Sequence, residues 1–422
     1  MSDARTPDTL RVALLSYRSK PHSGGQGVYV RHLSRELAGL GHDVEVVSGP
    51  PYPELDPRPG LRLTRLPSLD LYREPDPFRV PALREFRGPV DVAEWVLTST
   101  GGFPEPLTFS LRALAYLRRS TASGRRYDVV HDNQGLGYGL LGLRRLGLPL
   151  VATVHHPVTV DRDLELAATA SAVTRLRKRR WYSFVRMQRR VLPAAVRVVT
   201  VSQSSYDDLP RALGVDSTRL RVVPVGVDAT VFRPPTAPRV PGRLVAVASA
   251  DVPLKGVVPL LEAVAKLRTE RDVELVVVGS VRPDGPTGPT LDRLGLRTAV
   301  RFVGGLGEAE LVALLASADA AVVPSLYEGF SIPAVEAMAC ATPLVVTTAG
   351  ALPEVVGPDG DCALHVPPGD ADALAAAVLR LLDDPGLRQR LGAAGRRRVL
   401  DRFTWRAAAE RTVDVYREAL AC

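Results

Sequence analysis

Short apolar runs alternate along the chain with longer segments in which apolar residues recur at helical spacing. Such runs, rich in valine and leucine, predict buried strands of a parallel sheet, and the segments between them predict the helices that cover it. In the first half we predict strands at residues 10–17, 43–48, 128–131, 150–154, 196–201 and 220–225. In the second half we predict them at residues 244–249, 274–278, 300–303, 320–323 and 344–347. The fold class predicted is therefore α/β.

A proline-rich stretch without periodicity separates the two alternations. Residues 233–242 (RPPTAPRVPG) predict a linker between an N-terminal domain at 1–233 and a C-terminal domain at 242–402. The last segment, 403–422, has a helical pattern and no strand after it. Residues 50–110 are rich in proline and weakly periodic, and we interpret them as a large irregular excursion from the first domain.

Composition indicates an ordinary globular protein, with 45% apolar and 24% charged residues in a chain of 422. The formal charge of +8 favours anionic partners such as phosphates or acidic lipid headgroups. The three cysteines have no metal-type spacing, which indicates reduced thiols. The first residues lack the apolar core of a signal peptide, and no apolar run is long enough to span a bilayer. We therefore expect a cytoplasmic protein.

The segment at residues 324–346 (PSLYEGFSIPAVEAMACATPLVV) has the clearest chemistry. It leads from a predicted strand through Glu328 and Gly329 into a helix that we expect to begin near Pro333, because proline suits the first helical turn. Backbone amides at a helix start favour anions and hydroxyl-rich ligands. Glu328 and Glu336 flank this helix start at the open end of a parallel sheet, so both carboxylates are candidates for binding sugar hydroxyls.

This segment resembles the hallmark segment of the retaining family 4 glycosyltransferases. They have the GT-B architecture, two Rossmann-like parallel-sheet domains facing a central cleft, and include the phosphatidylinositol mannosyltransferases as distant relatives of this chain. Further matching motifs are Gly24-Gly25, residues 153–155 (TVH), 199–208 (VTVSQSSYDD), 222–232 (VVPVGVDATVF), Lys255-Gly256, 370–373 and 403–405. The resemblance implies a hexosyltransferase that uses a nucleotide-diphosphate sugar as donor and needs no cofactor.

The resemblance also implies roles for individual residues. Glu328 matches the glutamate that contacts the donor sugar, and Glu336 matches the one that bonds the nucleotide ribose. Lys255 matches the lysine that neutralises the diphosphate, and His155 matches the N-domain histidine near the reacting carbon. The other implied donor contacts are the loop residues Gly329, Phe330 and Ser331 and the glycine turn at Gly24 and Gly25.

In the same family the last helix packs back on the N-terminal domain, which suits residues 403–422. One departure concerns the diphosphate: the family usually has an arginine about six residues before the lysine, and here Ser249 stands there. Serine does not replace the bidentate phosphate contact of a guanidinium, so another arginine reaches in or the donor is arranged differently. Ser249 keeps a non-catalytic nucleotide-sugar-binding protein open as an alternative, and a sugar-nucleotide epimerase of similar fold is the other.

We expect the enzyme to work without a metal ion. Breaking the anomeric C–O bond leaves negative charge on the departing diphosphate, and a fixed ammonium with helix-terminal amides stabilises that charge in a dry cleft. Two D-x-D sequences, at 161–163 and 359–361, are similar to the metal-binding motif of another glycosyltransferase fold. One begins a predicted helix and the other lies in a Gly/Pro turn, so capping and turn chemistry explain them.

Polar residues also end two strands of the first domain, at residues 131–133 (HDN) and at His155-His156. Ligands of open parallel sheets bind at this edge, so we expect an acceptor, whether a glycan, a lipid or a small metabolite, near residues 24–27 and 131–133. Structural histidines are the alternative interpretation. The glycine turn lacks G-x-G-x-x-G spacing, which disfavours NAD.

Residues 175–190 contain eight basic side chains and no acidic one. Apolar residues recur between them at helical spacing, so one interpretation is a packed helix with a solvated basic face. The other is peripheral docking on an anionic membrane, where each basic residue near the surface adds ~1 kcal/mol. Nucleic acid is not an expected partner, because no RNA- or DNA-reading motif accompanies the segment.

Overall fold

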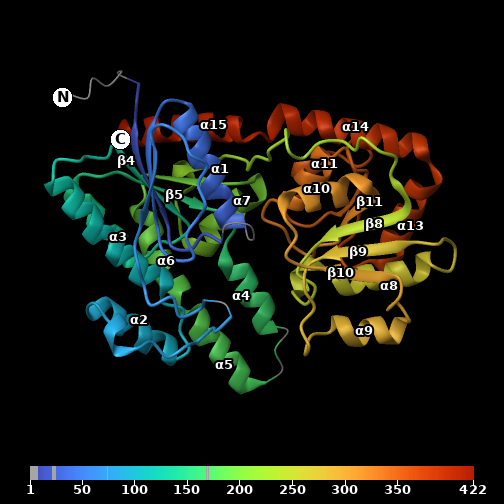
Figure 1. The fold of residues 1–422 in the computed structure, drawn as a ribbon, viewed down its shortest axis with the longest axis horizontal. Helices are drawn as coiled ribbons and strands as arrows, with labels where there is room; N and C mark the ends of the chain where they lie inside the picture. The colour runs from blue at the N-terminus through green and yellow to red at the C-terminus, as the bar shows by residue number, and fades with distance from the viewer. Residues whose placement is uncertain (1–7, 21–24, 74, 168, 170) are drawn as a thin grey trace. The chain divides into compact units, whose positions relative to one another are not determined.

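The computed structural model describes residues 8–20, 25–73, 75–167, 169 and 171–422, and it contains two compact units (Figure 1). Unit 1 takes in the described residues up to Val201, with Ser205–Val223 and Ala408–Cys422. Unit 2 takes in Ser202–Ser204 and Pro224–Ala407. The chain thus passes into unit 2 at Pro224, before the linker that we predicted at 233–242.

Unit 1 is built on a parallel sheet of seven strands in the order β3-β2-β1-β4-β5-β6-β7. The strands are β1 (Arg11–Ser16), β2 (Asp43–Ser48), β3 (Leu61–Arg65), β4 (Val129–Asn133), β5 (Leu150–Val154), β6 (Arg197–Thr200) and β7 (Leu220–Val222). Five successive residues of β1, Val12 to Ser16, are buried, because helices cover both faces of the sheet. Ala13 and Leu15 pack with Phe109 and Leu117, which places the third helix over one face.

The helices of unit 1 lie between the strands along the chain, singly or in groups. They are α1 (Gly25–Gly39), α2 (Pro89–Ser99), α3 (Glu105–Ala122), α4 (Val158–Ala167), α5 (Ala172–Trp181), α6 (Val185–Val191) and most of α7 (Gln203–Leu213). Figure 1 shows α1 and α3 on opposite sides of the strands. Helix α15 (Trp405–Leu420) returns late in the chain, and its residues from Ala408 onward belong to this unit.

Unit 2 is built on a parallel sheet of six strands in the order β10-β9-β8-β11-β12-β13. The strands are β8 (Val240–Val247), β9 (Glu274–Val278), β10 (Val300–Val303), β11 (Ala318–Val323), β12 (Leu344–Thr347) and β13 (Leu364–Val366). Its helices are α8 (Val257–Leu267), α9 (Thr287–Leu294), α10 (Glu308–Ser317), α11 (Ile332–Ala339), α12 (Leu352–Val356), α13 (Ala371–Asp383) and α14 (Pro385–Arg402). The strand order reverses between β8 and β11, which makes the carboxyl edge there the topological switch point.

The two predicted parallel α/β sheets are confirmed, with corrections at particular segments. Residues 50–110 are not an irregular excursion, because they contain β3, α2 and the start of α3. Strand β8 begins at Val240, inside the stretch predicted as linker, and β13 was not predicted. The basic segment 175–190 is divided among α5, a short 3-10 turn at Tyr182–Phe184 and α6. Among the described residues, no helix combines the length and the apolar character that crossing a membrane requires.

Candidate active site

The loop between β11 and α11 makes a sharp turn at Ser331. This residue has a φ of 81°, in the left-handed region that costs a side-chain-bearing residue about 1–2 kcal/mol. Its hydroxyl caps α11 by accepting a hydrogen bond from the backbone N–H of Ala334 at 3.4 Å, and Pro333 occupies the first helical turn. The strained turn directs the loop backbone from Glu328 to Ser331 toward the start of the helix.

Two glycines hold this loop against its neighbours. A Cβ on Gly256, whose φ is 63°, would lie 1.9 Å from the carbonyl oxygen of Pro324. A Cβ on Gly350, whose φ is 56°, would lie 2.2 Å from the carbonyl oxygen of Glu328. Two backbone hydrogen bonds also join these loops. The Leu326 N–H donates to the Leu254 carbonyl at 2.7 Å, and the Ala351 N–H donates to the Glu328 carbonyl at 2.9 Å. Loops that follow β8, β11 and β12 are thereby fixed together at the switch point.

Lys255 and Glu328 meet where these loops join. The Lys255 ammonium donates to Oε1 of Glu328 at 2.8 Å, and the Ser325 hydroxyl donates to the same oxygen at 2.8 Å. Glu328 is buried with 8% of its surface exposed, whereas the Lys255 side chain is 31% exposed. The structure thus brings together two predicted site residues, and part of the Lys255 side chain remains exposed.

The other predicted residues of unit 2 lie on the same loop and helix. Phe330 is buried and packs edge-on against Phe403 with ring centroids 5.6 Å apart, so its side chain anchors the loop. Glu336 is half-buried on α11, one turn after Ser331. Burial, and to a lesser extent the charge of Glu308, raises the pKa of Glu336 to about 8. Glu336 therefore holds its proton at neutral pH.

Ser249, the residue at the expected arginine position, is exposed after β8. An exposed arginine, Arg282, lies on the adjacent loop after β9, and its backbone N–H donates to the Asp251 carboxylate at 2.5 Å. The two loops are in close contact, because a Cβ on Gly279 would lie 2.1 Å from the carbonyl oxygen of Ala248. Sequence reasoning missed Arg282, since only the strand order shows that these loops are neighbours.

In unit 1, His155 directly follows β5 and is held on three sides. Its Nε2 lies 2.8 Å from Oδ1 of Asn133, and its backbone N–H donates to Oε1 of Gln134 at 2.8 Å. Its ring packs edge-on against Tyr29 at 4.7 Å. Burial lowers the pKa of His155 to about 3. His155 is therefore a neutral imidazole whose Nε2 carries the proton when Asn133 accepts through Oδ1.

A turn after β4 positions the partners of His155. Gln134 and Leu136 both have left-handed backbones, with φ of 55° and 51°. The buried Asp132 holds this turn by accepting a hydrogen bond from the Leu136 N–H at 2.8 Å, and burial raises the pKa of Asp132 to about 7. Gln134 also donates to the His156 carbonyl at 3.2 Å. Sequence reasoning missed Gln134, although its place in a polar run at a strand end was a usable signal.

Residues 131–133 do not present an acceptor surface as predicted, because all three are buried. His131 is bonded on both ring nitrogens, to Thr153 and to Tyr416, each at 2.6 Å, and it ties α15 to the sheet. His156 lies 2.7 Å from Asp161 at the start of α4. The structural interpretation therefore holds for His131.

The glycine turn is only partly described. Gly24 lies outside the described residues, and Gly25 is the exposed first residue of α1. Gly27 is required by close approach, since a Cβ there would lie 2.0 Å from the Lys20 carbonyl oxygen. In the part of the chain that the structure describes, no group of three or more His, Cys, Asp or Glu side chains is placed to hold a metal ion.

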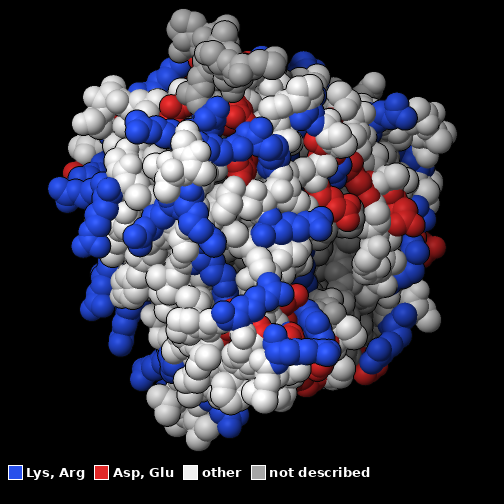
Figure 2. Space-filling view, turned by 60° about the vertical axis from the view of Figure 1, so that its left-hand side comes forward, with Lys and Arg blue, Asp and Glu red and all other residues white. Residues whose placement is uncertain are grey.

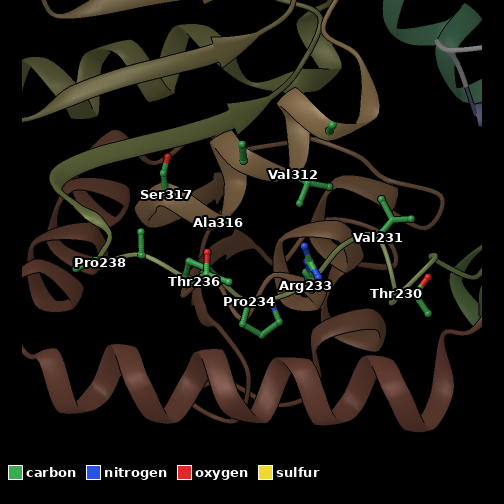
Figure 3. A pocket seen from close by; sticks show the side chains of 13 residues that line it. Thr230, Val231, Arg233, Pro234, Thr236, Pro238, Val312, Ala316 and Ser317 are labelled. Carbon is green, nitrogen blue, oxygen red and sulfur yellow. The ribbon is translucent and has the colours of Figure 1, made fainter.

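A hollow of about 620 Å³ in unit 2 lies away from these residues (Figure 3). Its lining comes from the segment between Thr230 and Pro238 and from α10, with Arg233 and Val312 among the contributing side chains. None of the predicted site residues lines it. This hollow therefore reflects how the segment before β8 packs on α10, and it has no part in the candidate site.

Comparison with known proteins gives consistent matches over both units. The family model described as Glycosyltransferase Family 4 matches residues 23–231, and the model described as Glycosyl transferases group 1 matches residues 230–398. The chain is 57% identical over 415 residues to a protein of Mycolicibacterium hassiacum named MMP alpha-(1->4)-mannosyltransferase, covering 98% of this chain and 99% of that protein. It is 32% identical to a glycogen synthase of Mycobacterium tuberculosis, covering 96% of this chain and 94% of that protein.

Two solved structures are also similar. A sucrose-phosphate synthase from Thermosynechococcus elongatus has a TM-score of 0.74 and 26% identity, covering 97% of this chain and 99% of that chain. The Anabaena protein Alr3699/HepE, in complex with UDP and glucose, has a TM-score of 0.66 and 17% identity, covering 96% of this chain and 98% of that chain. The second likeness concerns the fold alone.

Proposed function

The chain belongs to glycosyltransferase family 4, and on that premise we propose that it transfers mannose, with retention and without a metal ion, from a nucleotide-diphosphate sugar to a sugar hydroxyl. The resemblance to this family, the glycosyltransferase activity and the GT-B class are confirmed by the comparisons. The choice of mannose and of an α-(1→4) bond is supported by the 57% identical mannosyltransferase. The observation that carries the proposal is the Lys255–Glu328–Ser325 cluster at the switch point of unit 2.

We assign the donor sugar and the diphosphate to this cluster. The Glu328 carboxylate accepts hydrogen bonds from sugar hydroxyls, and the ammonium of the partly exposed Lys255 side chain pairs with the diphosphate. Because the ammonium is already held at 2.8 Å by Glu328, it meets the charge that develops on the leaving group without further reorganisation. The amides from Gly329 to Ser331 add fixed dipoles at the start of α11.

Arg282 is our candidate for the second phosphate contact. The usual arginine is replaced by Ser249, and Arg282 is an exposed arginine on the adjoining loop. Its backbone is fixed by the hydrogen bond to Asp251, so the loop keeps its place while the flexible guanidinium reaches the ligand. A guanidinium supplies the bidentate phosphate geometry that Ser249 lacks.

Glu336 is assigned to the nucleotide ribose. Its carboxyl lies on α11, and a carboxylate there accepts two hydrogen bonds from a ribose diol. Because the pKa of the free group is raised to about 8, ribose binding at neutral pH is coupled to loss of its proton.

His155 acts as a neutral hydrogen-bonding group near the reacting carbon. With a pKa of about 3 it is not a general base for physiological pH, since such a base works best with a pKa near the pH of the reaction. Asn133 is a positioning residue, because its contact with Nε2 determines which ring nitrogen has the proton.

A donor and acceptor screen tests the proposal. The protein is incubated in EDTA with GDP-mannose, UDP-mannose or ADP-mannose. Each donor is tested with and without an α-(1→4)-linked mannoside as the acceptor. We expect one donor to be consumed only when the acceptor is present, with an added mannose whose NMR signals show an α-(1→4) bond. Consumption without acceptor would favour an epimerase, binding without transfer would favour a non-catalytic protein, and activity restored by manganese would contradict the metal-free mechanism.

A further inference from the structure

Helix α2 buries its polar face and exposes its apolar face. Its buried residues are Asp91, Glu94 and Thr98, whereas Val92, Trp95 and Val96 are 49%, 39% and 46% exposed. A surface helix of a globular protein normally buries its apolar stripe and exposes its polar one. The apolar face of α2 is thus not part of the core of unit 1.

The reversal is fixed by polar contacts beneath the helix. Asp91 and Glu94 each lie 2.5 Å from the Arg112 guanidinium on α3, and Asp91 also accepts the backbone N–H of Arg87 at 2.7 Å. Rotating α2 to bury its valines would expose these bonds and leave Arg112 without its carboxylates. The outward direction of Val92, Trp95 and Val96 is therefore set by the packing of the unit itself.

The preceding segment extends the apolar face. Phe78, Val80 and Leu83 are 62%, 83% and 90% exposed, and Phe86 packs edge-on against Trp95 at 6.2 Å. We call the surface formed by Phe78, Val80, Leu83, Val92, Trp95 and Val96 the outer apolar face. Large exposed apolar residues concentrated in one short segment mark a surface that meets a partner or a membrane.

Basic side chains border the outer apolar face. Within residues 75–100 the exposed charged side chains are Arg84, Arg87 and Asp76, while Glu85 is paired with Arg79. The end of α5 adjoins the end of α2, because Arg180 donates to the Thr100 hydroxyl at 3.0 Å. The same end of α5 has the exposed Arg177 and Arg179, and residues 172–190 include no acid.

Figure 2 shows lysine and arginine side chains spread widely over the side of the protein that it brings forward, with acidic side chains in fewer places. From these observations we propose that the outer apolar face and the adjoining end of α5 form a docking surface for an anionic lipid bilayer. Apolar side chains with a tryptophan enter the headgroup region, and the arginines around them pair with lipid phosphates. The occupant is anionic lipid and not a second copy, because a symmetric dimer would bring each basic border against itself.

Binding to vesicles tests this surface. The probe is the full chain with vesicles of phosphatidylcholine alone or of equal parts phosphatidylcholine and phosphatidylglycerol, measured by flotation at low and high salt. One variant combines Val92→Ser, Trp95→Ser and Val96→Ser, and a second combines Arg84→Ser and Arg87→Ser. The matched control is Leu400→Ser on α14, whose side chain is also 49% exposed.

We expect binding to the anionic vesicles that weakens at high salt and is absent with phosphatidylcholine alone. The triple variant should lower the partition coefficient by more than about tenfold, and each arginine removed should lower it by about fivefold. Leu400→Ser should bind like the wild type, and all variants should keep the wild-type melting temperature and turnover in solution. Absence of binding by the wild type, or a wild-type dimer that the triple variant converts to a monomer, would overturn the proposal.

Discussion

Replacing Glu328 by glutamine separates catalysis from stability. The amide keeps nearly the shape of the carboxylate and can still accept the Ser325 hydroxyl, but it loses the ion pair with Lys255, whose atoms lie 2.8 Å apart in the native protein. Because the Lys255 side chain is 31% exposed, its ammonium can regain water when the carboxylate is removed. We therefore expect Glu328→Gln to lower the free energy of unfolding by only about 1 kcal/mol.

The expected effect on the reaction is larger. In our account the carboxylate orients the donor sugar while charge develops at its anomeric carbon and on the diphosphate. Loss of one such preorganised group costs about 10²–10³ in rate, or roughly 2.7–4 kcal/mol. Transfer should thus fall by two to three orders of magnitude in a protein that remains folded.

The assay measures kcat and KM for mannosyl transfer together with urea denaturation of the same preparations. Glu262→Gln is the matched control, since Glu262 is also paired with a basic residue of unit 2, Arg293 at 3.1 Å, on an exposed surface. That control should change neither the rate nor the stability by more than about 0.5 kcal/mol. Wild-type turnover by Glu328→Gln would refute the assignment of this carboxylate to the donor.

Three further predictions concern the remaining site residues. Asn133→Asp should raise the pKa of His155 from about 3, because it places an anionic carboxylate beside Nε2. The pH profile of kcat/KM should then decrease at acidic pH, a decrease that neither the wild type nor Asn133→Ala should show. The pKa of Glu336 is raised to about 8 in the folded state, whereas the unfolded chain loses this proton near the ordinary pKa of 4.5. The free energy of unfolding should therefore fall as the pH rises between these two values. Glu336→Gln should remove that fall, and calorimetry in buffers of different ionisation enthalpy should detect proton release on donor binding at pH ~7 only in the wild type. Arg282→Ala should weaken binding of the nucleoside diphosphate by about tenfold, whereas Arg297→Ala, in an exposed pair with Asp292, should leave it unchanged.

Parallel strands were predictable where both of their faces are buried. Strands such as β1 and β5 appear as largely apolar runs because helices cover both sides. The edge strand β3 (LRLTR) has no fully buried residue and contains two arginines, so it does not produce such a run. Helix α2 was missed because its apolar positions do not face a core, and its flanking prolines indicate loop.

Candidate site residues were predictable where they lie close together in the sequence. Glu328, Ser331 and Glu336 lie on one strand–loop–helix segment, so their neighbourhood is local. The sequence left His131 open between an acceptor residue and a structural one, because its partner Tyr416 is 285 residues away and no local pattern reveals that bond. Gln134 and Arg282 depend on a left-handed turn and on strand order, which exist only once the sheets have formed.

Nucleotide binding by Lys255→Ala is the decisive test of the proposed donor site. In the proposed donor site the Lys255 ammonium, held by Glu328, binds the diphosphate of the donor. Calorimetry should show that the variant binds the nucleoside diphosphate at least about tenfold more weakly than the wild type, while its affinity for the phosphate-free nucleoside is unchanged. Equal affinities of variant and wild type for the diphosphate would show that Lys255 does not bind the donor diphosphate.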